Sequence, residues 1–318
     1  MYPLLLKPAV KDYLWGGTRL KEEYKYECET EIAAEGWVLS CHKDGASVVK
    51  NGDMQGKTLP EVLDLWGEKA LGKNSEKFPY FPLLIKLIDA RDKLSVQVHP
   101  DDAYALENEG EYGKTEMWYV VDCDDGAELI YGFKENISKE EFENRIKDNT
   151  LTDVCNFVPV HKGDVFFIGA GTLHAIGKGI LIAEVQQNSN TTYRVSDYGR
   201  LGADGKPRPL HIEKAVDVTK CEKPSMPYGQ VGEITKVENN EVRNLASCEF
   251  FSADKLDLNG EFTVGMEENF VSLLCLEGKA NLCWDDGRMD INKGDSVFVP
   301  AGFKVKLEGK AEILCSYI

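Results

Sequence analysis

Four side chains have the types and the spacing of a metal site. Gln97 and His99 lie two residues apart in the run V-Q-V-H-P, so on a strand both would project from the same face. Glu116 begins a predicted strand, and His174 follows another. Two imidazole nitrogens, a carboxylate oxygen and an amide oxygen suit Zn²⁺ or another borderline divalent cation, with positions left open for water or substrate. The alternative for Glu116 alone is a solvated carboxylate at a strand end.

The other histidines and the cysteines are expected to carry no chemistry. His42, His161 and His211 are isolated, and isolated histidines are usually structural or solvated. The nine cysteines are an odd number without a C-x-x-C pair, so we expect neither a disulfide framework nor a thiolate zinc site. Several of them lie in apolar runs, as buried cysteines do in a reducing compartment.

The elements that must position these side chains are predicted to be mostly strands. Short runs rich in Val, Ile, Phe and Tyr alternate with Gly and charged turns, which is typical of β-sandwiches and barrels. Two capping-box patterns, T-L-P-E and S-K-E-E, predict helical insertions at about residues 58–72 and 138–157. The predicted strands are residues 116–121, 128–131, 164–168, 179–185, 249–254, 271–276, 295–300 and 311–318.

An internal repeat predicts the architecture. Residues 162–174 align without a gap on residues 293–305, in a frame of K-G-D, four strand residues and a turn at x-A-G. This frame resembles the second motif of the cupin β-barrels, and Val305 stands in the second copy where the first has His174. We therefore predict a mainly β chain with two cupin-type, jelly-roll-like β-barrels and a small helical insertion. Only the first barrel is expected to bind metal.

The domain connection is predicted between residues 213 and 233. Lys, Pro, Gly and Ser are enriched there, and Pro224 and Pro227 interrupt any periodicity. The expected domains are a catalytic cupin domain over residues 1–220, which contains both helical insertions, and a metal-free, cupin-like β domain over residues 221–318.

Several motifs in the first part of the chain occur together and in order. They are W-G-G at residues 15–17, P-L-L-I-K at 82–86, L-S-V-Q-V-H-P-D-D at 94–102, G-K-T-E-M-W-Y at 113–119, G-T-L-H-A at 171–175 and the stretch 184–194. In this combination the chain resembles the type I mannose-6-phosphate isomerases, specifically their short bacterial form. The resemblance implies a cupin-based, zinc-dependent enzyme that interconverts mannose 6-phosphate and fructose 6-phosphate.

The resemblance also implies roles for individual residues, with one zinc ion per chain. The family's zinc ligands fall on Gln97, His99, Glu116 and His174, its active-site arginine on Arg194, and its active-site lysines on Lys86 and Lys114. The family often reads S-D-N or S-D-T before that arginine, whereas residues 189–191 read S-N-T. An acid–base role for this Asp is therefore not carried over to Asn190.

Three further positions are assigned with their alternatives. Aldose–ketose isomerisation moves a proton between C1 and C2 through an enediol and needs a base. Glu184 resembles the family glutamate proposed as base; the alternative is a strand carboxylate that faces solvent. Lys86, a charge in an apolar run, is expected either to bind substrate or to snorkel from an edge strand. Trp15 is expected either to line the sugar site or to lie in the core.

Charge and composition limit the partners. The 318 residues contain 37 Lys plus Arg against 54 Asp plus Glu, and the net charge of −17 repels nucleic acids and anionic membrane surfaces. No apolar run reaches the roughly 20 residues of a membrane span, and the start lacks a signal peptide's pattern. We expect a cytoplasmic monomer or weak homo-oligomer with a phosphosugar substrate. The alternatives are a metal cupin oxidase or dioxygenase, and a non-catalytic sugar-phosphate-binding cupin.

Overall fold

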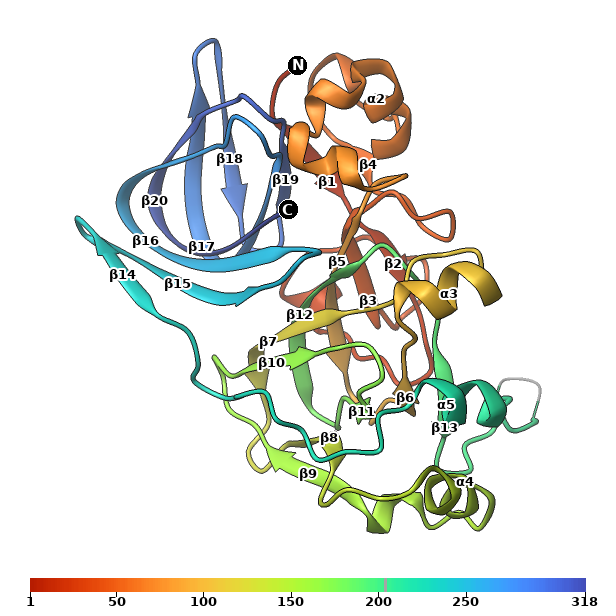
Figure 1. Ribbon diagram of the computed structural model, residues 1–318. Helices are drawn as coiled ribbons and strands as arrows, with labels where there is room; N and C mark the ends of the chain where they lie inside the picture. Colours follow the sequence, from red (N-terminus) through yellow and green to blue (C-terminus); the bar gives the residue numbers. More distant parts are fainter. Residues whose placement is uncertain (203–204) are drawn as a thin grey trace. The chain divides into compact units, whose positions relative to one another are not determined.

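The computed structural model describes residues 1–202 and 205–318, which form two compact units (Figure 1). The terminal unit contains Met1–Lys11, Thr18–Leu87 and Val231–Ile318. The central unit contains Asp12–Gly17 and Ile88–Gln230. The mainly β fold class is confirmed. The division into functional domains at residue 220 stays a prediction, because the compact units group segments from several parts of the chain.

The terminal unit is built on a large antiparallel sheet. Its strand order is β14-β15-β16-β20-β17-β19-β1-β4, and β18 pairs with β17. Alternate residues of the long strands project into one apolar core, which includes Leu256, Leu273, Val305 and Ile313. The strands are β1 (Leu4–Lys7), β4 (Val48–Val49), β14 (Ile234–Val237), β15 (Asn240–Ser247), β16 (Ser252–Val264), β17 (Val271–Trp284), β18 (Gly287–Asn292), β19 (Ser296–Val299) and β20 (Val305–Tyr317).

The N-terminal half of the terminal unit adds short helices and strands. The predicted helical segment at 58–72 is α2 (Leu59–Trp66) followed by the 3₁₀ turn η2 (Glu68–Ala70). The Glu61 carboxylate accepts a hydrogen bond from the Thr58 N–H at 2.7 Å, as the capping pattern predicts, and Gly67 ends the helix with a φ of +72°. The other elements are β2 (Ala9–Lys11), α1 (Arg19–Glu22), β3 (Glu35–Ser40), η1 (Gly52–Met54), η3 (Lys73–Lys77) and β5 (Leu83–Ala90), whose last three residues belong to the central unit.

The central unit contains two antiparallel arrangements of strands. One has the order β10-β7-β12 and the other β13-β6-β11-β8-β9. The helices α4 and α5 contribute Phe142, Ile146 and Ala215 to the core beneath the second arrangement. The elements are β6 (Val96–Val98), α3 (Asp102–Asn108), β7 (Glu116–Cys123), β8 (Glu128–Phe133), α4 (Lys139–Lys147), η4 (Leu151–Asp153), β9 (Cys155–Pro159), β10 (Val165–Ile168), β11 (His174–Ala175), β12 (Ile180–Gln187), β13 (Tyr193–Ser196) and α5 (Ile212–Val218).

The two copies of the sequence repeat make the same turn. The Asp164 carboxylate accepts a hydrogen bond from the N–H three residues upstream at 2.8 Å, and the Asp295 carboxylate does so at 2.9 Å. Gly163 and Gly294 have φ values of +88° and +92°, a region in which only glycine is free of strain. The equivalence predicted from the sequence therefore extends to the hydrogen bonds of the turn.

The strands that follow these turns are also equivalent. Ile168, four residues after Asp164, pairs with Glu116, and Val299, four residues after Asp295, pairs with Val271. The position of Glu116 in the first copy therefore corresponds to Val271 in the second. This equivalence bears on the number of metal ions that the chain can bind.

Two expectations from the sequence need correction: one helical insertion and the domain connection. The insertion predicted over residues 138–157 contains α4 and η4, but its last residues form β9, which pairs with β8. Asn149, with a φ of +56°, lies just beyond α4, and the following backbone turns into the strand. The region predicted as a domain connection begins with α5, and residues up to Gln230 belong to the central unit.

Within the described residues no helix is long and apolar enough to cross a membrane.

Candidate metal centre and active site

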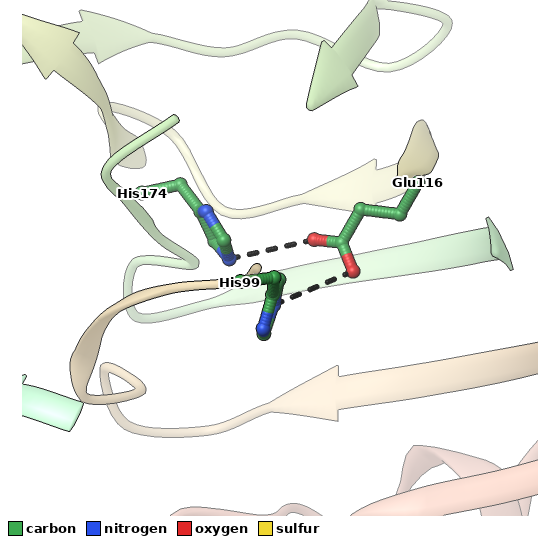
Figure 2. A group of neighbouring side chains, drawn as sticks. All are labelled: His99, Glu116 and His174. Atoms are coloured by element: carbon green, nitrogen blue, oxygen red, sulfur yellow. Dashed lines mark ion pairs between the residues drawn. The ribbon is translucent and has the colours of Figure 1, made fainter. Parts of the chain in front are cut away.

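Three of the four predicted ligands lie together in the central unit (Figure 2). His99 follows β6, Glu116 begins β7 and His174 begins β11. Each offers a ligand atom within 4.8 Å of the other two, and all three are buried. The Nε2 atom of His99 is 3.7 Å from Glu116 Oε2, and that of His174 is 3.4 Å from Glu116 Oε1. Both imidazoles therefore face one carboxylate.

Backbone carbonyls fix the orientation of both rings. The Nδ1 atom of His99 is 2.9 Å from the Thr191 carbonyl oxygen, and that of His174 is 2.9 Å from the Thr172 carbonyl oxygen. A carbonyl can only accept, so each Nδ1 carries a proton, and in the neutral imidazole this leaves the lone pair on Nε2. Metal-binding histidines commonly have such a partner on the nitrogen that does not bind the metal. The donor set and its orientation fit a divalent cation.

The protonation state of His174 agrees with this arrangement. The pKa of His174 is lowered to about 3, mainly by burial and also by the positive charge of Lys114, although the Thr172 carbonyl and Glu184 act in the opposite direction. His174 is therefore neutral at pH 7. The neutral imidazole is the form that binds a metal ion.

Gln97 lies beside the group on β6. It is directly opposite His174 of β11, and its amide nitrogen is 3.3 Å from His174 Nε2. Only the amide oxygen can bind a cation, and a half-turn of the amide exchanges the oxygen and the nitrogen. Gln97 is thus within reach of the role predicted for it.

Lys114 reaches the same atoms. Its Nζ lies 2.6 Å from Glu116 Oε2 and 3.1 Å from His99 Nε2. The lone pair on His99 Nε2 can accept a hydrogen bond from this ammonium group or can bind a metal ion, but not both. Lys114 and a bound metal ion therefore compete for this nitrogen. Lys114 is therefore a residue of the centre itself.

Arg194 lies on the face that carries Gln97 and His174. It is opposite Gln97 across β13 and β6, and residues directly opposite in an antiparallel pair project to the same face. One Nη donates a hydrogen bond to the Pro209 carbonyl at 3.2 Å. The buried Nε has no hydrogen-bond partner within the described residues. Burial and the neighbouring Arg208 lower the pKa of Arg194. A donor is therefore available for an anionic ligand.

Asp197 organises the segment that follows Arg194. Its carboxylate accepts hydrogen bonds from Arg200 Nη2 at 2.5 Å and from Arg208 Nε at 2.7 Å. Burial alone would raise the pKa of Asp197, but these hydrogen bonds lower it below its ordinary value. One ionised carboxylate thus ties two arginines to the loop beyond β13.

Glu184 is buried, rather than exposed on the strand. Its Oε2 accepts a hydrogen bond from the Trp118 indole N–H at 2.9 Å, and the two residues are opposite each other on β12 and β7. The Trp118 ring also meets the His174 ring edge to face, with 5.2 Å between centroids. Trp118 therefore contacts both the predicted base and a predicted metal ligand.

Lys86 and Trp15 lie in different compact units. In the terminal unit, Lys86 Nζ is 3.8 Å from Glu35 and 5.3 Å from the centroid of the Trp37 ring. Lys86 is only 4% exposed, so it does not snorkel to solvent. In the central unit, Trp15 is 6% exposed and its ring packs against Tyr13 with 5.6 Å between centroids.

Some residues of the site carry no signal in the sequence that we recognised. Trp118 stands in an apolar strand, where it looks like a core position. Gln187 is adjacent to Gln186 in a polar stretch. Of the histidines set aside, His211 accepts a hydrogen bond from the Arg194 backbone N–H at 3.1 Å. Trp118 could have been found from the alternation of side chains along a strand, because it is two residues from Glu116 and shares its face.

Two protein-family models match separate segments of the chain. The model described as phosphomannose isomerase type I, catalytic domain, matches residues 4–154. The model described as mannose-6-phosphate isomerase, cupin domain, matches residues 241–318, which include the second copy of the repeat. The cupin resemblance noted at that repeat is therefore supported independently.

Similar proteins cover essentially the whole chain. The mannose-6-phosphate isomerase of Streptococcus mutans is 40% identical over 316 residues, which are 99% of this chain and 98% of that relative. A mannose-6-phosphate isomerase of Bacillus subtilis is 39% identical over 318 residues and 99% of both chains. The crystal structure of mannose 6-phosphate isomerase from Bacillus subtilis matches with a TM-score of 0.90 at 36% identity, over all of both chains. This chain is a member of the type I phosphomannose isomerase family.

Proposed function

We propose that the protein is a mannose-6-phosphate isomerase that interconverts mannose 6-phosphate and fructose 6-phosphate. The observation that carries the proposal is the buried group of His99, Glu116 and His174, with both imidazoles oriented by backbone carbonyls. Membership of the family supplies the substrate class. Arg194, Lys114 and Glu184 add the charged groups that the reaction needs next to such a centre.

The proposed cofactor is one zinc ion. Gln97, His99, Glu116 and His174 would hold it through an amide oxygen, two Nε2 atoms and a carboxylate, a set without thiolates that zinc accepts in catalytic sites. When bound, zinc supplies Lewis-acid polarisation of carbonyl and hydroxyl oxygens and orients the sugar. Zinc in catalytic sites can reach a coordination number of five, so four protein ligands would still leave one position for substrate.

The proposed mechanism assigns the proton and the charge to residues of this chain. Glu184 takes the proton from C2 of mannose 6-phosphate, or from C1 of fructose 6-phosphate, which gives the enediol, and then returns it to the other carbon, while the hydroxyl proton moves between the substrate oxygens O1 and O2. Arg194 stabilises the negative charge that develops on the substrate oxygen, or binds the phosphate. Lys114 is the alternative proton acceptor. Lys86 and Trp15 stay predicted substrate-binding residues, on the strength of the family resemblance.

A coupled assay that follows fructose 6-phosphate formed from mannose 6-phosphate tests the proposal. We expect turnover by the zinc-loaded protein, its loss after chelation and its return when zinc is added back. Turnover that survives complete removal of metal would contradict the zinc proposal. Iron or manganese with O₂ consumption would favour an oxidase or dioxygenase, and sugar-phosphate binding without turnover would favour a non-catalytic cupin.

A further inference from the structure

Lys114 lies in a segment that no sheet or helix holds. Residues 113–115 connect α3 to β7 and belong to neither. The backbone of Glu116 is fixed by pairing with Ile168 and Gln186 on the two neighbouring strands. Lys114 precedes the strand, yet its side chain is only 5% exposed and its Nζ lies 2.6 Å from Glu116 Oε2. Other contacts must therefore fix the backbone that carries this ammonium group.

The Lys114 N–H donates a hydrogen bond to the Pro100 carbonyl at 3.0 Å, and Gln187 at the end of β12 provides further contacts to the next residue. Its Oε1 accepts a hydrogen bond from the Thr115 N–H at 2.9 Å, and its own backbone N–H donates to the Thr115 carbonyl at 3.1 Å. Its Nε2 donates to Asp102 Oδ1 at 2.8 Å. Gln187 is 2% exposed, so water does not readily replace these bonds. Both polar groups of the Thr115 backbone are thus bound to one residue.

Asp102 closes the network from the other side. Asp102 Oδ1, which accepts the hydrogen bond from Gln187 Nε2, also accepts one from the Gly113 N–H at 2.7 Å. A Cβ atom on Gly113 would lie 2.4 Å from the Asp101 carbonyl carbon, so only glycine permits this approach. The segment that carries Lys114 therefore packs directly against the backbone of Asp101 and Asp102, two to three residues beyond His99.

We propose that Gln187 and Asp102 are positioning residues that hold Lys114 against Glu116 and His99. Gln187 stands three residues after Glu184 and Asp102 three residues after His99, so the network joins the segments of a predicted base, a predicted ligand and Lys114. This inference rests on the proposed isomerase function, in which Lys114 is part of the active site. Neither positioning residue has to touch the substrate to act.

Gln187→Met tests the proposal because methionine keeps the length of the side chain and removes both amide functions. We expect kcat for mannose 6-phosphate to fall about 10- to 100-fold, since small displacements of a catalytic group cost that much. We expect KM to change less than about threefold, because the interaction lost is one made in the transition state. Zinc should remain at one equivalent, because the strand ladder holds Glu116. A kcat within about twofold of wild type would overturn the inference.

Two variants of Asp102 keep the test decisive if Gln187→Met folds poorly. Asp102→Asn retains an oxygen that can accept both hydrogen bonds and should keep most of kcat, whereas Asp102→Ala should lose it. Equal activity of these two variants would also overturn the inference.

Gln230→Met is the matched control. Gln230 also bonds a carboxylate through its amide, at Asp164, but this contact lies beyond the end of β10 remote from the residue paired with Glu116. We expect wild-type kcat and KM for it. A wild-type protein without turnover would count against the isomerase function itself. Active, zinc-loaded wild type with an equally active Gln187→Met would count against the positioning role alone.

Discussion

Arg194 is close to the metal centre but its charge excludes it from binding the metal. A guanidinium has donors and no acceptor, so it can stabilise phosphate or enediolate charge and cannot ligate a cation. We expect Arg194→Ala to lower kcat/KM about 100-fold or more, as removal of a group that stabilises transition-state charge does. Bound metal, measured by elemental analysis, should stay at the wild-type level.

The kinetic constants of Arg194→Ala separate its two possible roles. Equal losses in kcat and kcat/KM indicate a role in the transition state, and a raised KM alone indicates binding of the phosphate. Kinetics like those of the wild type would remove Arg194 from the active site, despite its place opposite Gln97.

Glu184 is tested by a substitution that preserves its hydrogen bond. In Glu184→Gln the amide oxygen can still accept the Trp118 indole N–H, but the side chain no longer accepts a proton as a carboxylate does. We expect exchange of the carbon-bound hydrogen of the substrate with solvent deuterium to slow about 100- to 10,000-fold. Zinc and sugar phosphate should still bind. Near-normal exchange, followed by NMR, would move the base elsewhere, with Lys114 the next candidate.

Residue types predicted the centre of the site better than its surroundings. Histidine and glutamate at His99, Glu116 and His174 are informative because buried ionisable groups need a reason to be there. Trp118 and Gln187 were not predicted as residues of the site, because tryptophan and glutamine have many other uses. Trp118 contacts Glu184, and Gln187 contacts Thr115 and Asp102. These contacts join segments that are far apart in the sequence, so local spacing does not reveal them.

At the scale of elements, the loop beyond β13 depends on the charge of Asp197. Its folded-state pKa is lowered, so the stabilisation is complete above the unfolded value of about 3.9 and is lost as the pH falls through the folded value. We expect Asp197→Asn to lower the free energy of unfolding by about 1.5–3 kcal/mol at pH 7, the range for hydrogen bonds to charged groups. The difference in the free energy of unfolding between Asp197→Asn and the wild type should shrink below about pH 4. Urea titrations at pH 7 and below pH 4 measure this difference. A difference independent of pH would show that ionisation of Asp197 is not its source.

Element boundaries were predictable where a local signal marks them. The capping pattern of Thr58 and Glu61 predicts the start of α2, and the structure contains the expected hydrogen bond from the Thr58 N–H to the Glu61 carboxylate. No such signal separates η4 from β9, in which the buried residues Cys155 and Val158 do not follow a strict alternation. The helix α5 was missed because Pro224 and Pro227 drew the whole region into a connection, although both follow the helix.

At the scale of the whole molecule, comparison of the chain with itself predicted more than composition did. The repeated K-G-D frame correctly identified two equivalent turns, because a glycine at positive φ and an aspartate that closes the turn are required by the backbone. Which distant segments share a unit was not predictable in this way. The pairing of Leu4 with Phe298, for example, brings the first strand into the sheet of the last ones, and neither sequence marks the other as its partner.

The equivalence of the two copies predicts the number of metal ions. Two ligand positions of the first copy are apolar in the second, because Val271 corresponds to Glu116 and Val305 to His174, and both valines lie in the apolar core of the terminal unit. Within the described residues, His99, Glu116 and His174 form the one cluster of at least three potential ligands. We therefore expect one equivalent of zinc per chain by elemental analysis, and none after His99→Ala and His174→Ala are combined. Two equivalents in the wild type, or metal retained by the double variant, would place a site outside this cluster. Val305→His alone should bind no additional metal, since a single imidazole in this apolar core lacks the second and third donors that a zinc site needs.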